Sequence, residues 1–220
     1  MFKNKKPVVA IDGTACSGKG TLAKKIAKAI NFDHLDTGIL YRYLAFLCIK
    51  NSTEYENINQ LFKQKIDLNH VKTLNLRTDE ISKKASIIAS KKEVREFLLN
   101  FQRNFSNFPP NGRGSVIDGR DIGSIVTPNA EVKFFIDAKV NIRACRRLSD
   151  LKSLTLKTLP SLEVICSQLE ERDDRDMNRA SSPLIRVKDA IFIDTTNISP
   201  DATLNKALKT IKKILINKTN

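Results

Sequence analysis

The sequence predicts an α/β protein whose parallel sheet is doubly wound, with helices on both faces. Short apolar segments alternate along the whole chain with segments of helical periodicity. The first apolar segment runs straight into a glycine-rich loop, and a helical segment follows that loop. With 220 residues and 41% hydrophobic content, the chain is long enough for one domain of this class with a good core.

The predicted elements follow one another in a regular order. The strand candidates are Val8–Ile11, His34–Leu35, Ser115–Ile117, Val132–Ile136 and Ile191–Ile193. The helix candidates are Thr21–Ile30, Ile39–Lys50, Ile81–Ser90, Glu93–Phe105, Asn141–Leu151, Leu162–Arg172 and Ala202–Ile216. Right-handed crossovers bring the loops that follow parallel strands to one edge of the sheet, so we expect the loops after the first three strands to meet there.

Two stretches fit this order poorly. Residues 51–77 are polar with only weak alternation, which indicates a small inserted subdomain. Residues 149–160 are rich in Leu, Lys, Ser and Thr and precede a charged helical segment, so we interpret them as a mobile flap.

The loop after the first strand has the spacing of a phosphate-binding loop. Residues 13–21 read GTACSGKGT, which contains the pattern G-x-x-x-x-G-K. Its end glycines let successive backbone N–H groups point into one hollow, Lys19 adds a positive charge, and the following helix adds its dipole. The loop is therefore predicted to bind the phosphates of a nucleotide. The alternative is a tight glycine-rich turn with a solvated lysine.

Gly20 and Asp118 indicate how the site could bind Mg²⁺. The residue after the lysine is usually the Ser or Thr that binds Mg²⁺, but here it is Gly20, and the hydroxyl follows at Thr21. Asp118 ends the third strand candidate like a Walker-B acid and could orient Mg²⁺ or its waters, since hard oxygen ligands suit that ion. Arg120 and Asp121 follow it toward the same cleft. The alternative is an ordinary turn with a glycine.

A second cluster follows the second strand candidate. Asp36 ends that strand, Thr37 and Gly38 form a turn, and the next helix carries Tyr41 and Arg42. This order presents a hydroxyl, an aromatic ring and a guanidinium near one mouth, where Arg42 could hold the phosphate of a second nucleotide. The alternative is a helix N-terminus with a surface arginine, and the cluster alone does not decide between them.

Residues 170–179, EERDDRDMNR, form the densest run of charge. Such a run is often a solvated helix face that carries salt bridges. Here Arg172, Arg175 and Arg179 fall at i, i+3 and i+7 on one helix face, and residues 180–184 end the helix immediately afterwards. We therefore also consider these arginines as candidates for binding an anion.

Composition narrows the classes of function. The net charge of +14 indicates anionic partners without choosing among them. The cysteines are scattered and only two histidines are present, so we expect neither a structural zinc site nor a disulfide framework. The longest apolar stretch, Tyr43–Ile49, is too short for a membrane span, and no signal peptide is evident, so we expect a cytoplasmic protein.

Taken together, the motifs resemble the bacterial cytidylate kinase family. Gly13–Thr21, Leu35–Arg42, Asp118–Asp121 and Glu171–Arg179 stand in its order and spacing, and the resemblance extends through Asp194–Thr196 over nearly the whole chain. It implies one P-loop kinase domain over residues 1–220 with a five-stranded parallel sheet. It also implies a shortened monophosphate-binding insert at 50–95 and a lid at 147–183. The implied reaction transfers the γ-phosphoryl group of ATP to CMP or dCMP, with Mg²⁺ accompanying ATP.

The resemblance also implies roles for individual residues. The ATP-binding residues are Gly13, Thr14, Ala15, Cys16, Ser17, Gly18, Lys19, Gly20 and Thr21. The CMP-binding residues are Asp36, Thr37, Tyr41, Arg42, Ser86, Arg95, Arg120, Asp121, Arg172, Asp176 and Arg179. Among these, Thr37, Arg42 and Arg120 resemble phosphate ligands, Ser86, Arg95 and Asp121 resemble cytosine contacts, and Arg172 and Asp176 resemble ribose contacts. The catalytic residues are Lys19, Arg120, Arg146, Arg147 and Arg175, with Asp118 toward the metal. Thr37 departs from the Ser that is common in the family.

Other functions remain open at this point. The acceptor could be UMP, AMP or a sugar, although a sugar would not need Arg42, Arg120, Arg172 and Arg179 together. A nucleic-acid-binding P-loop ATPase would need stacking aromatics, yet the chain has no Trp and three Tyr, so we do not expect a nucleic-acid partner. We also expect a monomer and no membrane partner. Cys16 is either a small residue that fits the loop or a thiol activated by it. Cys48, Cys145 and Cys166 are expected to be buried in helices.

Overall fold

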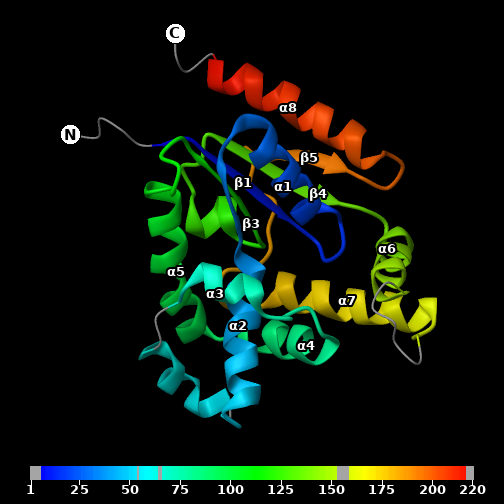
Figure 1. Cartoon of the computed structure of the whole chain (residues 1–220). Coiled ribbons are helices and arrows are strands. Elements are labelled where there is room, and N and C mark those ends of the chain that lie inside the picture. Colours follow the sequence, from blue (N-terminus) through cyan, green and yellow to red (C-terminus); the bar gives the residue numbers. More distant parts are fainter. Residues whose placement is uncertain (1–5, 54, 64–65, 153–158, 217–220) are drawn as a thin grey trace.

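The computed structural model describes residues 6–53, 55–63, 66–152 and 159–216. Its centre is a five-stranded parallel sheet in the order β2-β3-β1-β4-β5 (Figure 1). The strands are β1 (Val8–Gly13), β2 (Asp33–Asp36), β3 (Ser115–Asp118), β4 (Val132–Asp137) and β5 (Ile191–Asp194). The predicted fold class and every strand candidate are confirmed, with ends that differ by one or two residues.

Helices and helical turns connect the strands. They are α1 (Lys19–Ile30), α2 (Thr37–Lys50), η1 (Tyr55–Lys63), α3 (Leu68–Thr73), α4 (Asp79–Ile88), α5 (Lys92–Asn107), η2 (Ile122–Val126), α6 (Val140–Lys152), α7 (Leu162–Asn178) and α8 (Pro200–Ile216). Helix α7 runs six residues beyond the predicted end at Arg172, through the charge run. The two charge signs alternate there, so the run supports a helix instead of ending one. In the described part of the chain, no helix is long and apolar enough to cross a bilayer.

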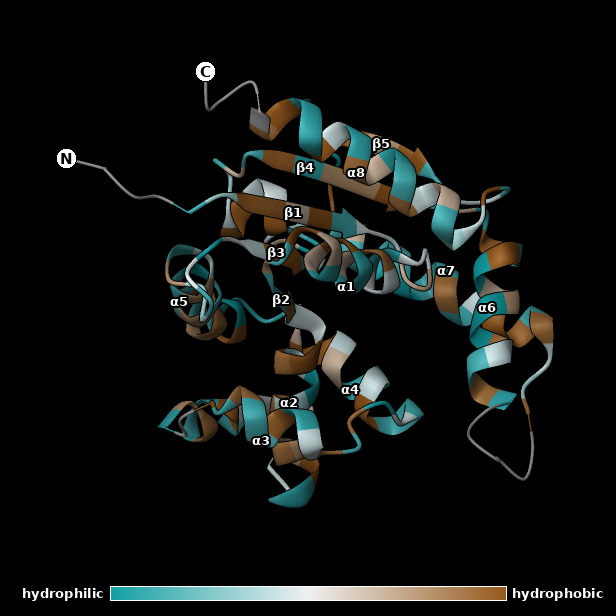
Figure 2. Cartoon of the chain, turned by 45° about the horizontal axis from the view of Figure 1, so that its top comes forward, coloured by the Kyte–Doolittle hydropathy of each residue, from teal (hydrophilic) through white to brown (hydrophobic). Residues whose placement is uncertain are grey.

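The sheet is covered on both faces because side chains alternate along each strand. Val9 and Ile11 of β1 point to one face, where they pack with residues of α1 and α8 such as Ile26 and Ile211. Val8 and Ala10 point to the other face, toward Phe101 and Phe105 of α5. Figure 2 shows the strands as mostly apolar, with helices on either side.

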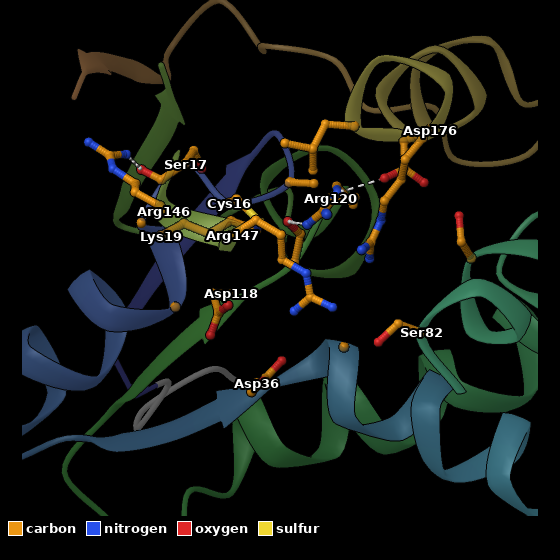
Figure 3. A pocket seen from close by; sticks show the side chains of 18 of the residues that line it. Cys16, Ser17, Lys19, Asp36, Ser82, Asp118, Arg120, Arg146, Arg147 and Asp176 are labelled. Carbon is orange, nitrogen blue, oxygen red and sulfur yellow. Dashed lines mark hydrogen bonds and ion pairs between the residues drawn. The ribbon is translucent and has the colours of Figure 1, made fainter. Parts of the chain in front are cut away.

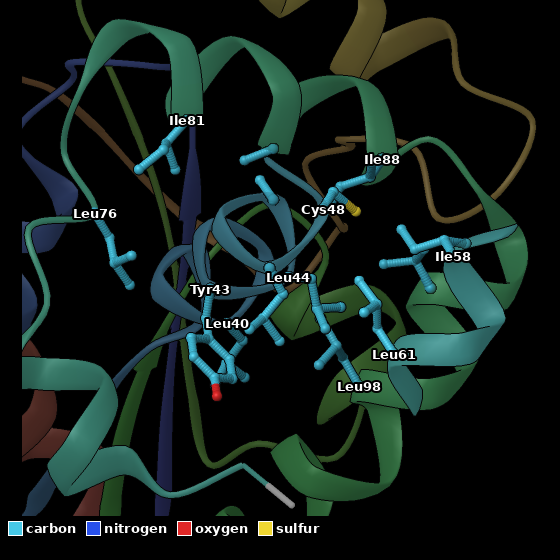
Figure 4. Close-up of a cluster of buried hydrophobic side chains, with 14 of the residues drawn as sticks. Leu40, Tyr43, Leu44, Cys48, Ile58, Leu61, Leu76, Ile81, Ile88 and Leu98 are labelled. Carbon is cyan, nitrogen blue, oxygen red and sulfur yellow. The ribbon is translucent and has the colours of Figure 1, made fainter. Parts of the chain in front are cut away.

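A second apolar cluster lies beside the sheet and holds the inserted segment together (Figure 4). Leu40, Leu44 and Cys48 lie on one side of α2, at intervals of four residues, and pack against η1, α3, α4 and α5. Within the described residues of the predicted insert, 50–53, 55–63 and 66–95, the chain forms helices and no strand. The insert boundaries at 50 and 95 stay a prediction, as do those of the lid at 147 and 183.

Helices α6 and α7 form a third unit that packs beside the glycine-rich loop (Figure 1). Leu151 of α6 and Ile165 and Leu169 of α7 are buried together with Ala15 of the loop. Half of the predicted flap at 149–160, positions 153–158, lies outside the described residues.

Three loops meet at the carboxyl edge of the sheet, as predicted. The strand register aligns Ile11 with Asp118 and Asp36 with Asp118, so β1, β2 and β3 end side by side. Gly13 has a φ of +150°, and a Cβ atom there would lie 1.9 Å from the carbonyl oxygen of Ile136. Only glycine lets the loop leave β1 this close to β4.

Candidate active site

The three loops open into a cleft with a volume of about 1020 Å³ (Figure 3). The glycine-rich loop forms one wall, and α2, α4, α6, α7 and the loop after β3 form the others. Every residue predicted for the site lines this cleft except Gly13 and Thr14. Gly13 packs on β4, and the Thr14 hydroxyl donates to Asp137 Oδ1 at 2.5 Å.

Lys19 lies buried at the centre of the glycine-rich loop. Its ammonium donates to the carbonyl oxygen of Thr14 at 2.9 Å. Burial lowers the pKa of Lys19 to about 7, and the positive charges of Arg120 and Arg172 act in the same direction. An anion in the hollow would offset these effects, so this part of the cleft is suited to a phosphate.

The loop leaves the first N–H groups of α1 available to a ligand. Gly18 caps this helix in the left-handed conformation, with φ of 91°, and makes no side-chain cap hydrogen bond. Helix α1, which lies entirely within the described chain, carries no acidic residue in its first turn. Backbone donors and the positive end of the helix dipole therefore both face the hollow.

Asp118 is held by a residue that the sequence analysis did not identify as part of the site. Its Oδ1 lies 2.7 Å from Nε2 of His34, which comes from the neighbouring strand. Its Oδ2 lies beside the phosphate loop, 3.5 Å from where a Cβ on Gly20 would be. Across the described residues no group of three or more His, Cys, Asp or Glu could hold a metal ion. Asp118 fits Mg²⁺ only as one oxygen ligand among phosphates and waters, a common arrangement for that ion.

Arginines crowd the middle of the cleft. Arg120 donates from Nε to Oδ2 of Asp176 at 2.8 Å. Burial, together with the nearby charge of Arg120, lowers the pKa of Arg172 to about 10. Among the described side chains, Arg172 Nε and Arg179 Nη2 are buried N–H groups without a hydrogen-bond partner. Such donors are costly to bury unpaired, so their position favours an anionic or polar ligand here.

The mouth next to α2 carries a carboxylate between two arginines. Asp36 Oδ2 accepts from Arg77 at 3.0 Å, and a Cβ on Gly38 would lie 3.0 Å from Asp36 Oδ1 and 3.1 Å from Arg42 Nη1. Burial acts to raise the pKa of Asp36, but Arg42 and Arg77 outweigh it and lower that pKa. Arg42 remains positioned at the cleft, as the sequence predicts.

The far end of the cleft is a buried polar pocket. Arg95 Nη2 lies 2.5 Å from Asp121 Oδ2, and both residues are 6% exposed. The Arg95 guanidinium also lies over the Tyr41 ring, 5.4 Å from its centroid. The Ser86 hydroxyl accepts from Arg175 Nη1 at 2.9 Å. Of the three residues that the family resemblance grouped as base contacts, Arg95 and Asp121 pair with each other, and Ser86 lines the same cleft.

The structure separates Arg146, Arg147 and Arg175, which the resemblance named together as catalytic residues. Arg146 donates to the carbonyl oxygens of Ser17 at 3.2 Å and Thr195 at 2.7 Å, so it grips the loop. Arg147 forms an ion pair with Asp79 of α4, and Arg175 reaches Ser86 on the same helix. The latter two side chains therefore span the cleft from α6 and α7 to α4.

Sequence reasoning missed several residues around the site. His34 stands two residues before Asp36 in the strand, so the alternation of side chains could have placed both on one face. Two partners of the loop were missed: Arg143 has no motif to mark it, and Asp173 lies in the charge run 170–179, where only the arginines and Asp176 were considered. The expected burial of the other cysteines is wrong for Cys145, which is exposed, because it lies on the solvent side of α6.

Comparisons with known proteins identify the family to which the chain is similar. Residues 9–213 match the family model described as cytidylate kinase. The chain is 39% identical over 203 residues to a protein named cytidylate kinase from Paramagnetospirillum magneticum, a match that covers 91% of this chain and 95% of that protein. It is 41% identical over 210 residues to the protein of that name from Bartonella henselae, covering 94% and 95%.

A solved structure is similar in fold. The crystal structure of an uncharacterized protein from Eubacterium ventriosum matches with a TM-score of 0.56 at 16% sequence identity. The match covers 95% of this chain and 99% of that one. At this identity the similarity concerns the fold alone.

Proposed function

This chain belongs to the cytidylate kinase family, and from that premise we propose how its residues divide the work. The protein transfers the γ-phosphoryl group of ATP to CMP or dCMP, which yields ADP and CDP or dCDP. The observation that carries our assignment is a cleft that has a phosphate loop on one side and a buried pocket of paired Arg and Asp on the other.

On the donor side, the glycine-rich loop binds the phosphates of ATP. Lys19 and the backbone N–H groups at the start of α1 supply the positive potential. The buried position of Lys19 supports this role, because its charge gains most when an anion replaces water beside it.

Asp118 belongs to the same proposal as the residue that orients Mg²⁺. The metal, when bound with ATP, neutralises charge on the phosphate oxygens. His34 holds Oδ1 of Asp118 and leaves Oδ2 toward the loop. Asp118 thus supplies one fixed oxygen, either directly or through a water.

On the acceptor side, residues at different depths of the cleft bind different parts of CMP. Arg42, Arg120 and Thr37 hold the phosphate of CMP, and Arg172, Asp176 and Arg179 contact its ribose. Two unpartnered N–H groups support the second part, Arg172 Nε and Arg179 Nη2. At the closed end, Ser86, Arg95 and Asp121 contact the cytosine edge.

The chemistry needs positioning more than covalent work by the protein. Both substrates in one cleft place the acceptor phosphate in line with the γ-phosphoryl group. Arg120, Arg147 and Arg175 then offset charge that develops on the transferred group. Closure of α6 and α7 toward α4 excludes water, which would otherwise hydrolyse ATP. We place this reaction in the cytoplasm, where both nucleotides occur, and on a monomer, since one chain builds the cleft.

An assay of ADP release against a panel of nucleoside monophosphates tests the acceptor assignment. We expect CMP and dCMP to be used at least about tenfold more efficiently than UMP, because uracil turns a carbonyl oxygen toward the Asp121 carboxylate at the position where cytosine has an amino group that can donate. Equal kcat/KM values for UMP and CMP would contradict the cytosine contacts, and preference for AMP would contradict the acceptor site. ADP release that depends on nucleic acid would favour the ATPase alternative, which family membership does not favour.

A further inference from the structure

One residue of the phosphate loop, Ala15, is held by three separate contacts from α6 and α7. Its N–H donates to Asp173 Oδ1 at 3.0 Å. Its carbonyl oxygen accepts from Arg143 Nη1 at 3.1 Å. The residue is 2% exposed, and its methyl group packs in the apolar cluster between the two helices. The tip of the loop is thus inserted into the α6–α7 unit.

The two side chains that hold Ala15 also bind each other. Arg143 of α6 and Asp173 of α7 form a short ion pair, and each residue is 6% exposed. Arg143 also donates from Nε to the carbonyl oxygen of Ala138 at 2.8 Å, at the root of α6. A planar guanidinium can make these contacts together, which fixes the geometry of the pair.

This pair lies behind the lining of the cleft, from where the charge of Asp173 still acts on Arg120. Among the residues that line the cleft, Ala15 is present but neither Arg143 nor Asp173 is. The peptide that follows Ala15 leads to Cys16, whose φ is +58°, a left-handed conformation that residues with a Cβ adopt at a cost. Such a conformation persists only where neighbouring contacts hold it. The contacts on Ala15 hold the chain just before Cys16, and Arg146 and Thr195 hold the carbonyl oxygen of Ser17 just after it.

We infer that Arg143 and Asp173 are positioning residues for ATP: they lock the Ala15–Cys16 turn of the phosphate loop and tie that turn to the α6–α7 unit. The inference rests on the proposed binding of ATP phosphates by this loop. When α6 and α7 move, the loop amides move with them. The shape of the phosphate hollow therefore depends on where the two helices lie, although neither side chain contacts a nucleotide.

The main test is a charge-neutral double variant, Arg143→Gln with Asp173→Asn. It breaks the clasp, by which we mean the Arg143–Asp173 ion pair with its two hydrogen bonds to Ala15. It does so without leaving one buried charge unpaired, which is the change that would most endanger folding. We expect the KM for ATP to rise at least about tenfold, since small displacements of positioning groups cost that much or more. The KM for CMP, measured at saturating ATP, should stay within about threefold of the original value.

Two further variants sharpen the result. Lys152→Gln with Asp174→Asn removes the same charges from exposed positions on the same two helices, and we expect both KM values to stay within about twofold. Arg143→Lys keeps the charge opposite Asp173 but loses the planar fork, and we expect an intermediate rise in the KM for ATP. This variant also provides the measurement if the double variant does not fold.

The outcomes separate this inference from the assignment of the loop itself. Equal factors of change in the two KM values, or a KM for ATP within about twofold of the original in a folded clasp variant, would overturn the positioning role. The variant Lys19→Ala separately tests whether the loop is the ATP site. If that variant keeps its affinity for ATP, the assignment of the donor site fails. If it loses that affinity while the clasp variants behave normally, only the present inference fails.

Discussion

Lys19 is a buried cation among other cations. Burial, with Arg120 and Arg172 nearby, brings its pKa to about 7, so the free enzyme near neutral pH holds this group only partly protonated. Binding of a phosphate raises that pKa again, and nucleotide binding is therefore accompanied by proton uptake near pH 7. The buried charge of Lys19 that serves the reaction therefore lowers the stability of the folded protein when no nucleotide is bound.

Replacement of Lys19 by alanine should therefore separate activity from stability. We expect kcat to fall at least about 100-fold, as for loss of one preorganised charge in an active site. The free energy of unfolding should not fall, because a poorly solvated charge is removed. Steady-state kinetics and urea unfolding measure the two effects. Lys28→Ala, an exposed site on the same helix, is the control and should leave both unchanged.

Cys16 offers a direct report on occupancy of the loop. It is half-buried, lines the cleft and sits among the backbone donors of the loop. We expect iodoacetamide to label Cys16 more slowly when Mg-ATP is present, because the phosphates fill the hollow. Peptide-resolved mass spectrometry measures the rates. Cys145, exposed on α6, is the internal control whose labelling ATP should not change. Equal labelling of Cys16 with and without nucleotide would argue against the assigned donor site.

At the scale of elements, one carboxylate sets the start of η2. Asp12 at the end of β1 accepts from the N–H groups of Ile122 and Gly123 at 2.8 and 2.7 Å. These residues directly follow Arg120 and Asp121, so Asp12 fixes the loop that carries two of the proposed acceptor contacts. Burial raises the pKa of Asp12 to about 7 despite the two hydrogen bonds.

This raised pKa predicts a pH dependence of stability. Between the ordinary pKa of aspartate and about 7, the folded state binds more protons than the unfolded state. Asp12 therefore contributes stability that is complete below pH 4 and lost as the pH rises through 7, by about 1.4 kcal/mol per pH unit in that window. Asp12→Asn should remove this slope. Urea unfolding at several pH values measures it, and an equally steep slope in the variant would assign the effect elsewhere.

At the scale of the whole molecule, two contacts bridge the cleft. Arg147 of α6 reaches Asp79 at the start of α4, and Arg175 of α7 reaches Ser86. The Asp79 side chain is 65% exposed, so this ion pair adds little to stability, on the order of 0.5 kcal/mol. Its effect is to hold α4 close to the α6–α7 unit, because α4 and that unit pack in separate apolar clusters.

Removal of this bridge should loosen α4 in the free enzyme. We expect Asp79→Asn to increase amide hydrogen exchange over residues 79–88 without nucleotide, while ATP with CMP restores protection. Melting temperature should change little. Glu80→Gln, one position along in the same helical turn, controls for loss of an acidic group near the helix N-terminus. Equal exchange in both variants would show that the bridge does not hold α4.

The sequence predicts individual strands and helices well, but it does not predict which side chains of distant elements contact one another. The parallel sheet and the edge where Asp36 and Asp118 meet could be predicted, because strand periodicity and the crossover rule act locally. The clasp on Ala15 could not, since Asp173 lies 158 positions away and its charge resembles that of its solvated neighbours. Within the insert, the helix at 81–90 could be predicted, but η1 and α3 could not, as their apolar side chains are buried only in a cluster shared with α2.

The gathering of guanidinium groups along the cleft has a further consequence, for the encounter with substrate. Arg42, Arg120 and Arg172 face one hollow in a chain whose net charge is +14. Low-dielectric walls focus such a field outward, so that anionic nucleotides are drawn toward the opening before any contact is made. The association rate constants of ATP and CMP are therefore raised by long-range attraction, and they fall steeply as dissolved salt shortens the Debye length.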